Sequence, residues 1–546
     1  MARHHARLWP FPVRSFASER LRPEKSHRFL LPVRSLLGLA VLLAFALAGC
    51  ASGSTGGQGT GPKSGGTLNV GLDSDVVTLD PLKSTALVDR EVMFNIYDTL
   101  VTVDAQNKIQ PGLASSWSYP SPTQIAFTLR SGIQFQDGTP FNAAAVVTNI
   151  NRILNTASSP RHSELSTVTS VKAVDDLHVQ FDLKQPFSPL LANLTDRAGM
   201  ILSPAVIQSQ GDQIANNPAK AGTGPFQFVS WTKGDHLTLE RNPHYWQKDS
   251  SGNALPYLAK VNYRPITNES VMFTNLQTET INVAQVISPT DVQATKQNQS
   301  LVYKQIPGLS FYGMELNTKT APLDNVHVRR AVEWAVDRQE ILNSVLHGIG
   351  VEAQGPVSPS SWAYDASIKP YSHNVDKAKA ELSQAGMSSG VSFTLLISSG
   401  SPLLQQQAQF LQSELKPAGI TVNIKQETFA TLLDDTSSHH FQAALLGWSG
   451  RPDPDGNMYG WFHTGGGFND TQYSNAHVDA LLDDARTSSD QSKRTSDYQQ
   501  AEKLILDDAP YVFLYHGVAS QISTKNVQNF QLLPTTIMVF TKTYLS

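Results

Sequence analysis

The chain has 546 residues and a formal net charge of −4. A slightly acidic chain argues against a DNA or RNA partner, because nucleic-acid binding needs clustered Lys and Arg. The length exceeds what one ordinary hydrophobic core organises, so we expect two or three domains.

The N-terminus resembles an export signal. Residues 1–35 carry eight basic and two acidic side chains, and an apolar run of twelve residues follows over 36–47. This order is typical of a secretory signal, and the run is shorter than the roughly 20 residues that span a bilayer core. It ends in Leu47-Ala48-Gly49-Cys50, which looks like the site at which bacterial lipoproteins are cleaved and lipidated.

Cys50 is the single cysteine of the chain, so it has no partner for an internal disulfide. We therefore predict a lipoprotein signal peptide over 1–49 and a lipid on Cys50 that anchors the protein to the outer face of the cell membrane. The alternative is that Cys50 is only a small apolar residue at the end of the signal. Cleavage there would leave a formal net charge of about −10.

The segment 50–65 is rich in Gly, Ser and Thr and is predicted to be a flexible linker. From residue 66 on, strand-like and helix-like segments alternate, which indicates an α/β architecture. In chain order we expect a strand over 67–72, a helix that includes Val92 and Ile96, and half-buried strands over 125–129 and 177–183. Asn142 is placed to cap a helix with an apolar stripe from Val146 to Leu154.

The clearest local unit comes later in the chain. A strand over 391–398, a helix over 402–416 and a strand over 421–426 form a βαβ pattern, which predicts parallel strands and a right-handed crossover. A helix from residue 429 and a strand over 443–448 should extend the same sheet. Two helices over 477–486 and 492–507 then precede a strand over 511–515.

Several segments resemble one known family when they are taken together. They are TLDPLKST, NIYDTLVTVDAQNKIQPGLASSW, FTLRSGIQFQDGTPFNAAAVV, GTGPFQFVSW, LERNPHYW, NTKTAPLDNVHVRRAVEWAVDRQEIL, YSNAHVDALLDDAR and APYVFLYH. No single segment is decisive, because GTGPF alone is only a turn and DGTP only a turn that leads into a helix. Their order over about 480 residues resembles extracytoplasmic solute-binding protein family 5, the peptide, opine and nickel type.

That resemblance implies a two-lobed α/β fold of the periplasmic-binding-protein type, in its type II, large cluster C form, with an inserted accessory domain. Carried onto this chain, lobe I covers 66–103, 223–301 and 518–546, the accessory domain covers 104–222, and lobe II covers 302–517. The chain would then cross between the lobes near 302 and 517, and the two crossings would form a hinge that closes on the ligand.

The resemblance also implies a function. The protein would be an ABC transporter substrate-binding lipoprotein that delivers a peptide or peptide-like solute to permease and ATPase subunits. It would be a monomeric receptor with no cofactor, metal or nucleic acid. The sequence contains no His-Glu-x-x-His or phosphate-loop motif that would favour an enzyme.

The segment 447–457 bears on the ligand. In peptide-binding relatives an acidic residue after a Gly-Trp pair binds the ligand's amine, but here that position falls on Arg451. Asp453 or Asp455 would serve if the loop is shifted by two residues. Otherwise Arg451 would bind a carboxylate or phosphate, or it would form a loop salt bridge with Asp453. The segment 398–401 holds no base, and both departures weaken a dipeptide interpretation.

Aromatic side chains are candidate walls of the site, with core packing as the alternative for each: Tyr312, Trp448 and Trp461. Asn317 is a candidate hydrogen-bond partner of the ligand, or else it caps the following turn. Within the same family, a nickel or metal-chelate receptor is a second hypothesis, for which the adjacent His439 and His440 are the candidates. A chemosensory receptor component is a third.

Overall fold

The computed structural model describes residues 62–353, 355–369 and 371–546. The predicted signal peptide and Cys50 lie outside the described residues. In the described part of the chain, no helix is both long enough and apolar enough to cross a membrane.

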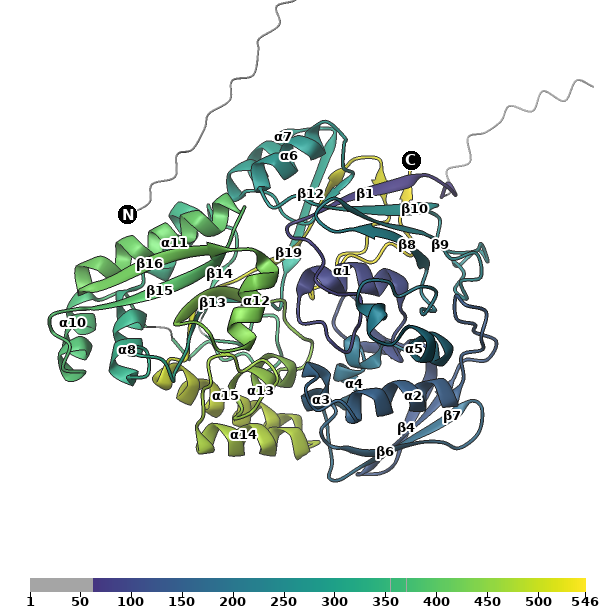
Figure 1. Cartoon of the computed structure of the whole chain (residues 1–546), viewed down its shortest axis with the longest axis horizontal. Helices are drawn as coiled ribbons and strands as arrows, with labels where there is room; N and C mark the ends of the chain where they lie inside the picture. Colours follow the sequence, from purple (N-terminus) through teal and green to yellow (C-terminus); the bar gives the residue numbers. More distant parts are fainter. Residues whose placement is uncertain (1–61, 354, 370) are drawn as a thin grey trace, which may run out of the picture. The chain divides into compact units, whose positions relative to one another are not determined.

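The first lobe is built on a seven-stranded mixed sheet (Figure 1). Its strands in spatial order are β12 (Leu301–Pro307), β19 (Val518–Thr524), β11 (Val283–Ala284), β1 (Thr67–Leu72), β10 (Lys260–Pro265), β9 (His236–Arg241) and β8 (Phe226–Thr232). Its helices are α1 (Leu87–Ile96), α5 (Pro204–Gln210), α6 (Glu269–Gln277) and α7 (Val292–Gln297). The predicted opening strand over 67–72 is confirmed, and it pairs in parallel with both β10 and β11.

The accessory domain contains a four-stranded antiparallel sheet. Its strands in spatial order are β4 (Ala114–Ser121), β5 (Gln124–Leu129), β7 (His178–Leu183) and β6 (Val168–Ala173), and its helices are α2 (Ala143–Leu154), α3 (Pro160–Glu164) and α4 (Leu190–Asn193). A short hairpin of β2 (Val101–Val103) and β3 (Ile109–Pro111) precedes it. The predicted cap of α2 is confirmed, because the Asn142 side chain accepts the Ala145 N–H.

The second lobe has a six-stranded sheet. Its strands in spatial order are β14 (Val351–Glu352), β18 (Tyr511–His516), β13 (Phe311–Leu316), β17 (Ala443–Trp448), β15 (Val391–Ser398) and β16 (Ile420–Glu427). Its helices are α8 (Val326–Ala335), α9 (Arg338–Glu340), α10 (Val375–Gln384), α11 (Pro402–Leu415), α12 (Phe429–Ser437), α13 (Asp455–Phe462), α14 (Ala476–Thr487) and α15 (Gln491–Asp508). The predicted βαβ unit is confirmed as β15, α11 and β16, whose strands are parallel neighbours.

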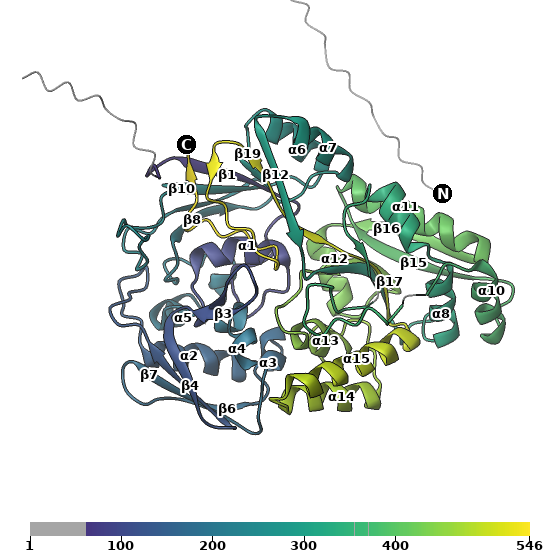
Figure 2. The same ribbon diagram turned by 180° about the vertical axis from the view of Figure 1, so that it is seen from behind.

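Two adjacent segments join the lobes (Figure 2). β12 and β19 pair antiparallel over their whole lengths in the first sheet. In the chain, β12 leads into β13 of the second sheet, and β18 of the second sheet leads into β19. The structure thus keeps β12 in the first sheet, and the chain leaves that sheet after Pro307 instead of near residue 302. Gly308 and Gly517 touch at this crossing, where a Cβ on Gly308 would lie 2.8 Å from the Gly517 carbonyl oxygen.

The C-terminal residues return to the first lobe, where β20 (Val527–Gln528) pairs with β21 (Tyr544–Leu545). Met538 and Phe540 pack in the same core as Leu68 and Val70 of β1. From the second lobe, Phe429 packs against this core as well, so the lobes are in contact.

Candidate ligand-binding site

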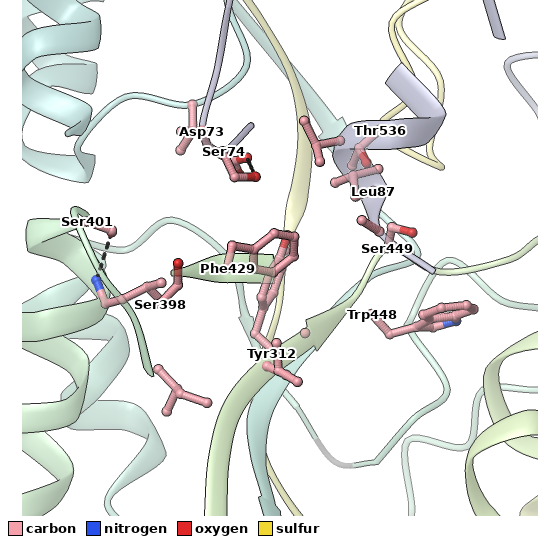
Figure 3. Close-up of a pocket in the computed structure, with 18 of the residues that line it drawn as sticks. Asp73, Ser74, Leu87, Tyr312, Ser398, Ser401, Phe429, Trp448, Ser449 and Thr536 are labelled. Carbon is pink, nitrogen blue, oxygen red and sulfur yellow. Dashed lines mark hydrogen bonds between the residues drawn. The ribbon is translucent and has the colours of Figure 1, made fainter. Parts of the chain in front are cut away.

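A cavity of about 640 Å³ lies between the two lobes. From the first lobe, the start of α1 and the loop after β1 line it, and from the second lobe β13, β17 and the loop before α11 do so. Figure 3 shows Asp73 and Leu87 facing Ser398, Phe429 and Tyr312 across this space. Residues from both lobes therefore enclose one space, of a size within the range of about 300–1,000 Å³ that is usual for small-molecule sites.

The three predicted aromatic residues all line the cavity. Tyr312 stacks on Tyr515 with ring centroids 5.0 Å apart, and burial raises the pKa of the Tyr312 phenol to about 12. Trp448 and Trp461 are 5% and 6% exposed and also belong to a buried aromatic cluster under the sheet. Both predicted roles, cavity wall and core packing, are thus combined in these two side chains.

Arg451 lies behind this wall and does not line the cavity. Its guanidinium is stacked on the Trp448 ring at 4.1 Å, and its Nε lies 3.4 Å from an Asp196 carboxylate oxygen of the accessory domain. The predicted Arg451–Asp453 salt bridge is wrong, because each of the two side chains has another charged partner. Asp453 pairs with Arg494 at 2.7 Å.

Asp455 is equally committed to the protein, since its carboxylate accepts two hydrogen bonds from Arg486, at 2.7 and 3.0 Å. Asn317 also lies away from the cavity and is fully buried. Its Nδ2 donates to the Phe441 carbonyl at 3.0 Å and its Oδ1 accepts from the Gln472 side chain at 3.1 Å. Both side chains therefore hold loops of the second lobe in place.

A buried ion cluster beside the cavity joins the lobes. Asp196 is 4% exposed, and its carboxylate contacts Arg90 at 2.5 Å and Arg197 at 3.3 Å in addition to Arg451. Burial alone would raise the pKa of Asp196, but the Arg451, Arg90 and Arg197 guanidiniums outweigh it and hold that pKa far below its usual range. Arg90 also donates to the Ser449 hydroxyl of the second lobe at 2.6 Å.

The charged groups that line the cavity are almost all acidic. No Lys or Arg lines the cavity among the described residues. Five carboxylates line it: Asp73, Glu91, Glu269, Glu315 and Asp470. His439 also lines it, whereas its neighbour His440 does not. Among the described residues, no group of three or more His, Cys, Asp or Glu side chains is arranged to hold a metal ion.

Two of the carboxylates already accept hydrogen bonds from backbone N–H groups. Glu91 accepts the Met538 N–H at 2.6 Å, and burial raises the pKa of Glu91 to about 8. Glu269 of the first lobe accepts the Ser401 hydroxyl and, at 3.5 Å, the Leu403 N–H at the start of α11. Sequence reasoning identified none of these acidic residues, because each lies in an ordinary strand, helix or loop and only the fold brings them together.

A cavity enclosed by two lobes, which are joined by a pair of adjacent strands, defines a two-lobed solute-binding protein. A model of the family described as bacterial extracellular solute-binding proteins, family 5 Middle, matches residues 108–469. The chain belongs to this family, and it is accordingly an extracytoplasmic substrate-binding protein of an ABC transporter and not an enzyme.

Individual relatives agree with this assignment. The probable D,D-dipeptide-binding periplasmic protein DdpA of Escherichia coli K12 is 32% identical over 486 residues, which cover 87% of this chain and 93% of that protein. DppA of Helicobacter pylori, solved in complex with the peptide STSA, has a TM-score of 0.81 at 28% identity and covers 88% of this chain and 98% of its own. AppA of Bacillus subtilis, solved with a nonapeptide, has a TM-score of 0.83 at 27% identity, with coverages of 89% and 100%. The expected fold is thereby confirmed.

Proposed function

We propose that this protein captures a small peptide or peptide-like solute with a free amine and delivers it to the permease of an ABC importer. The observation that carries the proposal is the acidic lining of the cavity, which contains five acidic side chains and neither Lys nor Arg among the described residues. In a partly desolvated cleft these carboxylates favour a cationic group, because opposite charges attract more strongly at low effective dielectric. The amine would thus have partners other than Asp453 and Asp455.

The start of α1 supports the zwitterionic character of the ligand. Thr85, Leu87 and Val88 line the cavity, and the first turn of α1 has no side-chain cap. The first N–H groups of a helix are free donors and its N-terminus carries partial positive charge, so this end suits a ligand carboxylate. The corresponding end of α11 is already occupied by Glu269. The peptides named for the E. coli and H. pylori relatives have both groups.

Matched ligands test the proposal. We would measure thermal unfolding of the purified protein with di- and tripeptides and with the same peptides acetylated at the N-terminus. A ligand specific for the closed form should add about 2.7 kcal/mol at 100 times its dissociation constant. We expect free peptides to stabilise the protein and acetylated peptides to lose most of that effect. Equal stabilisation by both forms would refute the role of the amine.

We also propose that the mature protein is anchored by a lipid on Cys50. The support is the lipoprotein-like sequence at residues 47–50 and the solitary cysteine. Cell fractionation of Cys50→Ser tests this, because a chain that lacks the acceptor should leave the membrane fraction. Mass spectrometry of the wild-type N-terminus should show an acylated Cys50, and a free thiol there would contradict the proposal.

A further inference from the structure

One carboxylate of the cavity has no partner within the described residues. Glu315 lies in the middle of β13, is 1% exposed and lines the cavity. Neither of its carboxylate oxygens has a hydrogen-bond partner among the residues that the structure describes. Buried polar groups in folded proteins are nearly always paired, so an unpaired carboxylate that faces a cavity calls for a specific explanation.

The neighbours of Glu315 in the sheet cannot supply a partner. It lies opposite Ala444 of β17 and Tyr511 of β18, and the Tyr511 hydroxyl already donates to the Leu446 carbonyl. Burial, with a smaller contribution from Asp470, raises the pKa of Glu315 well above its usual range. The protein thus keeps an acidic side chain where an apolar one would stabilise the fold better.

A second acidic residue faces the same part of the cavity. Asp470 lies in the loop between α13 and α14 and lines the cavity. Burial raises the pKa of its carboxyl, and the Thr436 hydroxyl lowers it in part. The His439 ring nitrogen Nδ1 lies 3.0 Å from the Asp470 carbonyl oxygen, which fixes the loop against the end of α12.

Most of the remaining wall that the cavity draws from these elements is apolar, although Ser437, His439 and Asn469 also line it. The apolar side chains come from α12, β17, α13 and the loop after α13: Leu432, Leu433, Leu446, Trp461 and Phe468. A group that reaches the two carboxylates must therefore have an apolar stem, which these side chains would cover, and a charged end. Lys and Arg side chains have this combination of alkyl stem and cationic head.

We infer that Glu315 and Asp470 form a recognition pocket for a ligand side chain that ends in an ammonium or guanidinium group. This inference rests on the proposed function, because it places the solute in this cavity, and it adds which solutes are preferred. The cation provides the partner that Glu315 lacks. The two carboxylates together supply hydrogen-bond acceptors for the N–H groups of a guanidinium or ammonium. A neutral ligand of equal length would leave Glu315 unpaired.

The test compares Ala-Lys, Ala-Arg and Ala-norleucine by calorimetry with the complete chain in detergent. Norleucine has the alkyl stem of Lys without its amine. We expect wild type to bind the basic peptides at least tenfold more tightly than Ala-norleucine. Glu315→Gln should abolish that ratio and change Ala-norleucine binding by less than threefold, and Asp470→Asn, at a less buried position, should reduce the ratio.

Glu502→Gln is the matched control. Glu502 is also buried in the second lobe, and burial raises its pKa to about 8, but it does not line the cavity. This variant should keep the wild-type ratio. Unfolding midpoints of all variants show whether each is folded. If Glu315→Gln does not fold, the affinity ratio of Asp470→Asn tests the inference instead.

The outcomes separate this inference from the proposed function. Equal wild-type affinity for basic and neutral peptides, or an unchanged ratio in a folded Glu315→Gln protein, overturns the inference and leaves the peptide receptor standing. If no peptide binds, the proposed function fails. Binding of hexylamine and hexanol then tests the inference. Wild type should bind hexylamine more tightly than hexanol and Glu315→Gln should not, and any other result overturns the inference.

Discussion

Asp196 offers a sharp test of how the lobes are held together. Asp196→Asn keeps the shape of the side chain and one oxygen for the Arg197 N–H, which now donates to the carboxylate at 2.7 Å. It removes the negative charge that lies 2.5, 3.3 and 3.4 Å from three guanidiniums. Because breaking a buried ion pair from one side leaves the partner charge uncompensated, we expect a loss of about 3–5 kcal/mol in the free energy of unfolding.

The assay is urea unfolding of wild type and variant, with Asp212→Asn as the control. Asp212 forms an ion pair of similar length, 2.6 Å to Lys83, but both side chains are largely exposed. Exposed ion pairs contribute little to stability, so the unfolding midpoint of Asp212→Asn should stay at the wild-type value. Arg451→Met should cost less than Asp196→Asn, because it removes one of the mutually repelling guanidiniums. Equal midpoints for Asp196→Asn and Asp212→Asn would refute the reasoning.

Three further variants probe the fold. Asn142→Ala removes the cap of α2 and should lower the unfolding free energy by about 1 kcal/mol in urea titrations. Burial raises the pKa of Glu502 to about 8. The stability gained by keeping Glu502 protonated is therefore complete below the ordinary carboxyl pKa and is lost as the pH rises to about 8. Glu502→Gln should therefore reduce the fall in unfolding free energy between pH 5 and 8 by up to about 1.4 kcal/mol per pH unit. Gly308→Ala places a Cβ 2.8 Å from the Gly517 carbonyl and should cost about 1–3 kcal/mol; an unchanged melting temperature would show that the crossing can spread apart.

Local patterns predicted most of the secondary structure. The strand over 391–398, the helix after Pro402 and the strand over 421–426 follow from alternation, a helical stripe and Gly419 as a stop, which are all local signals. The position of β12 did not follow from such signals. Its partner β19 begins more than 200 residues later, and no pattern within residues 301–307 specifies that pairing.

The site was less predictable than the fold. Tyr312, Trp448 and Trp461 were found because large aromatic residues near strand ends are conspicuous in the sequence. Glu315 was missed, since one acidic residue in FYGMEL reads as the exposed side of a strand until β17 and β18 cover it. Counting from Gly447 made the cleft one of two alternatives for Arg451, the other being a salt bridge with Asp453. In the structure Arg451 packs on Trp448 and contacts Asp196 behind the wall.

The paired crossing also limits how the protein can move. β12 and β19 are bonded to each other along seven residue pairs, and their continuations β13 and β18 are bonded again in the second sheet. Sliding one of these strands along the other would break backbone hydrogen bonds in both sheets, whereas Gly308 and Gly517 lie between the two paired stretches. We therefore expect any opening of the lobes to occur by bending at this crossing, so that closure returns the same side chains to the same registration around the solute.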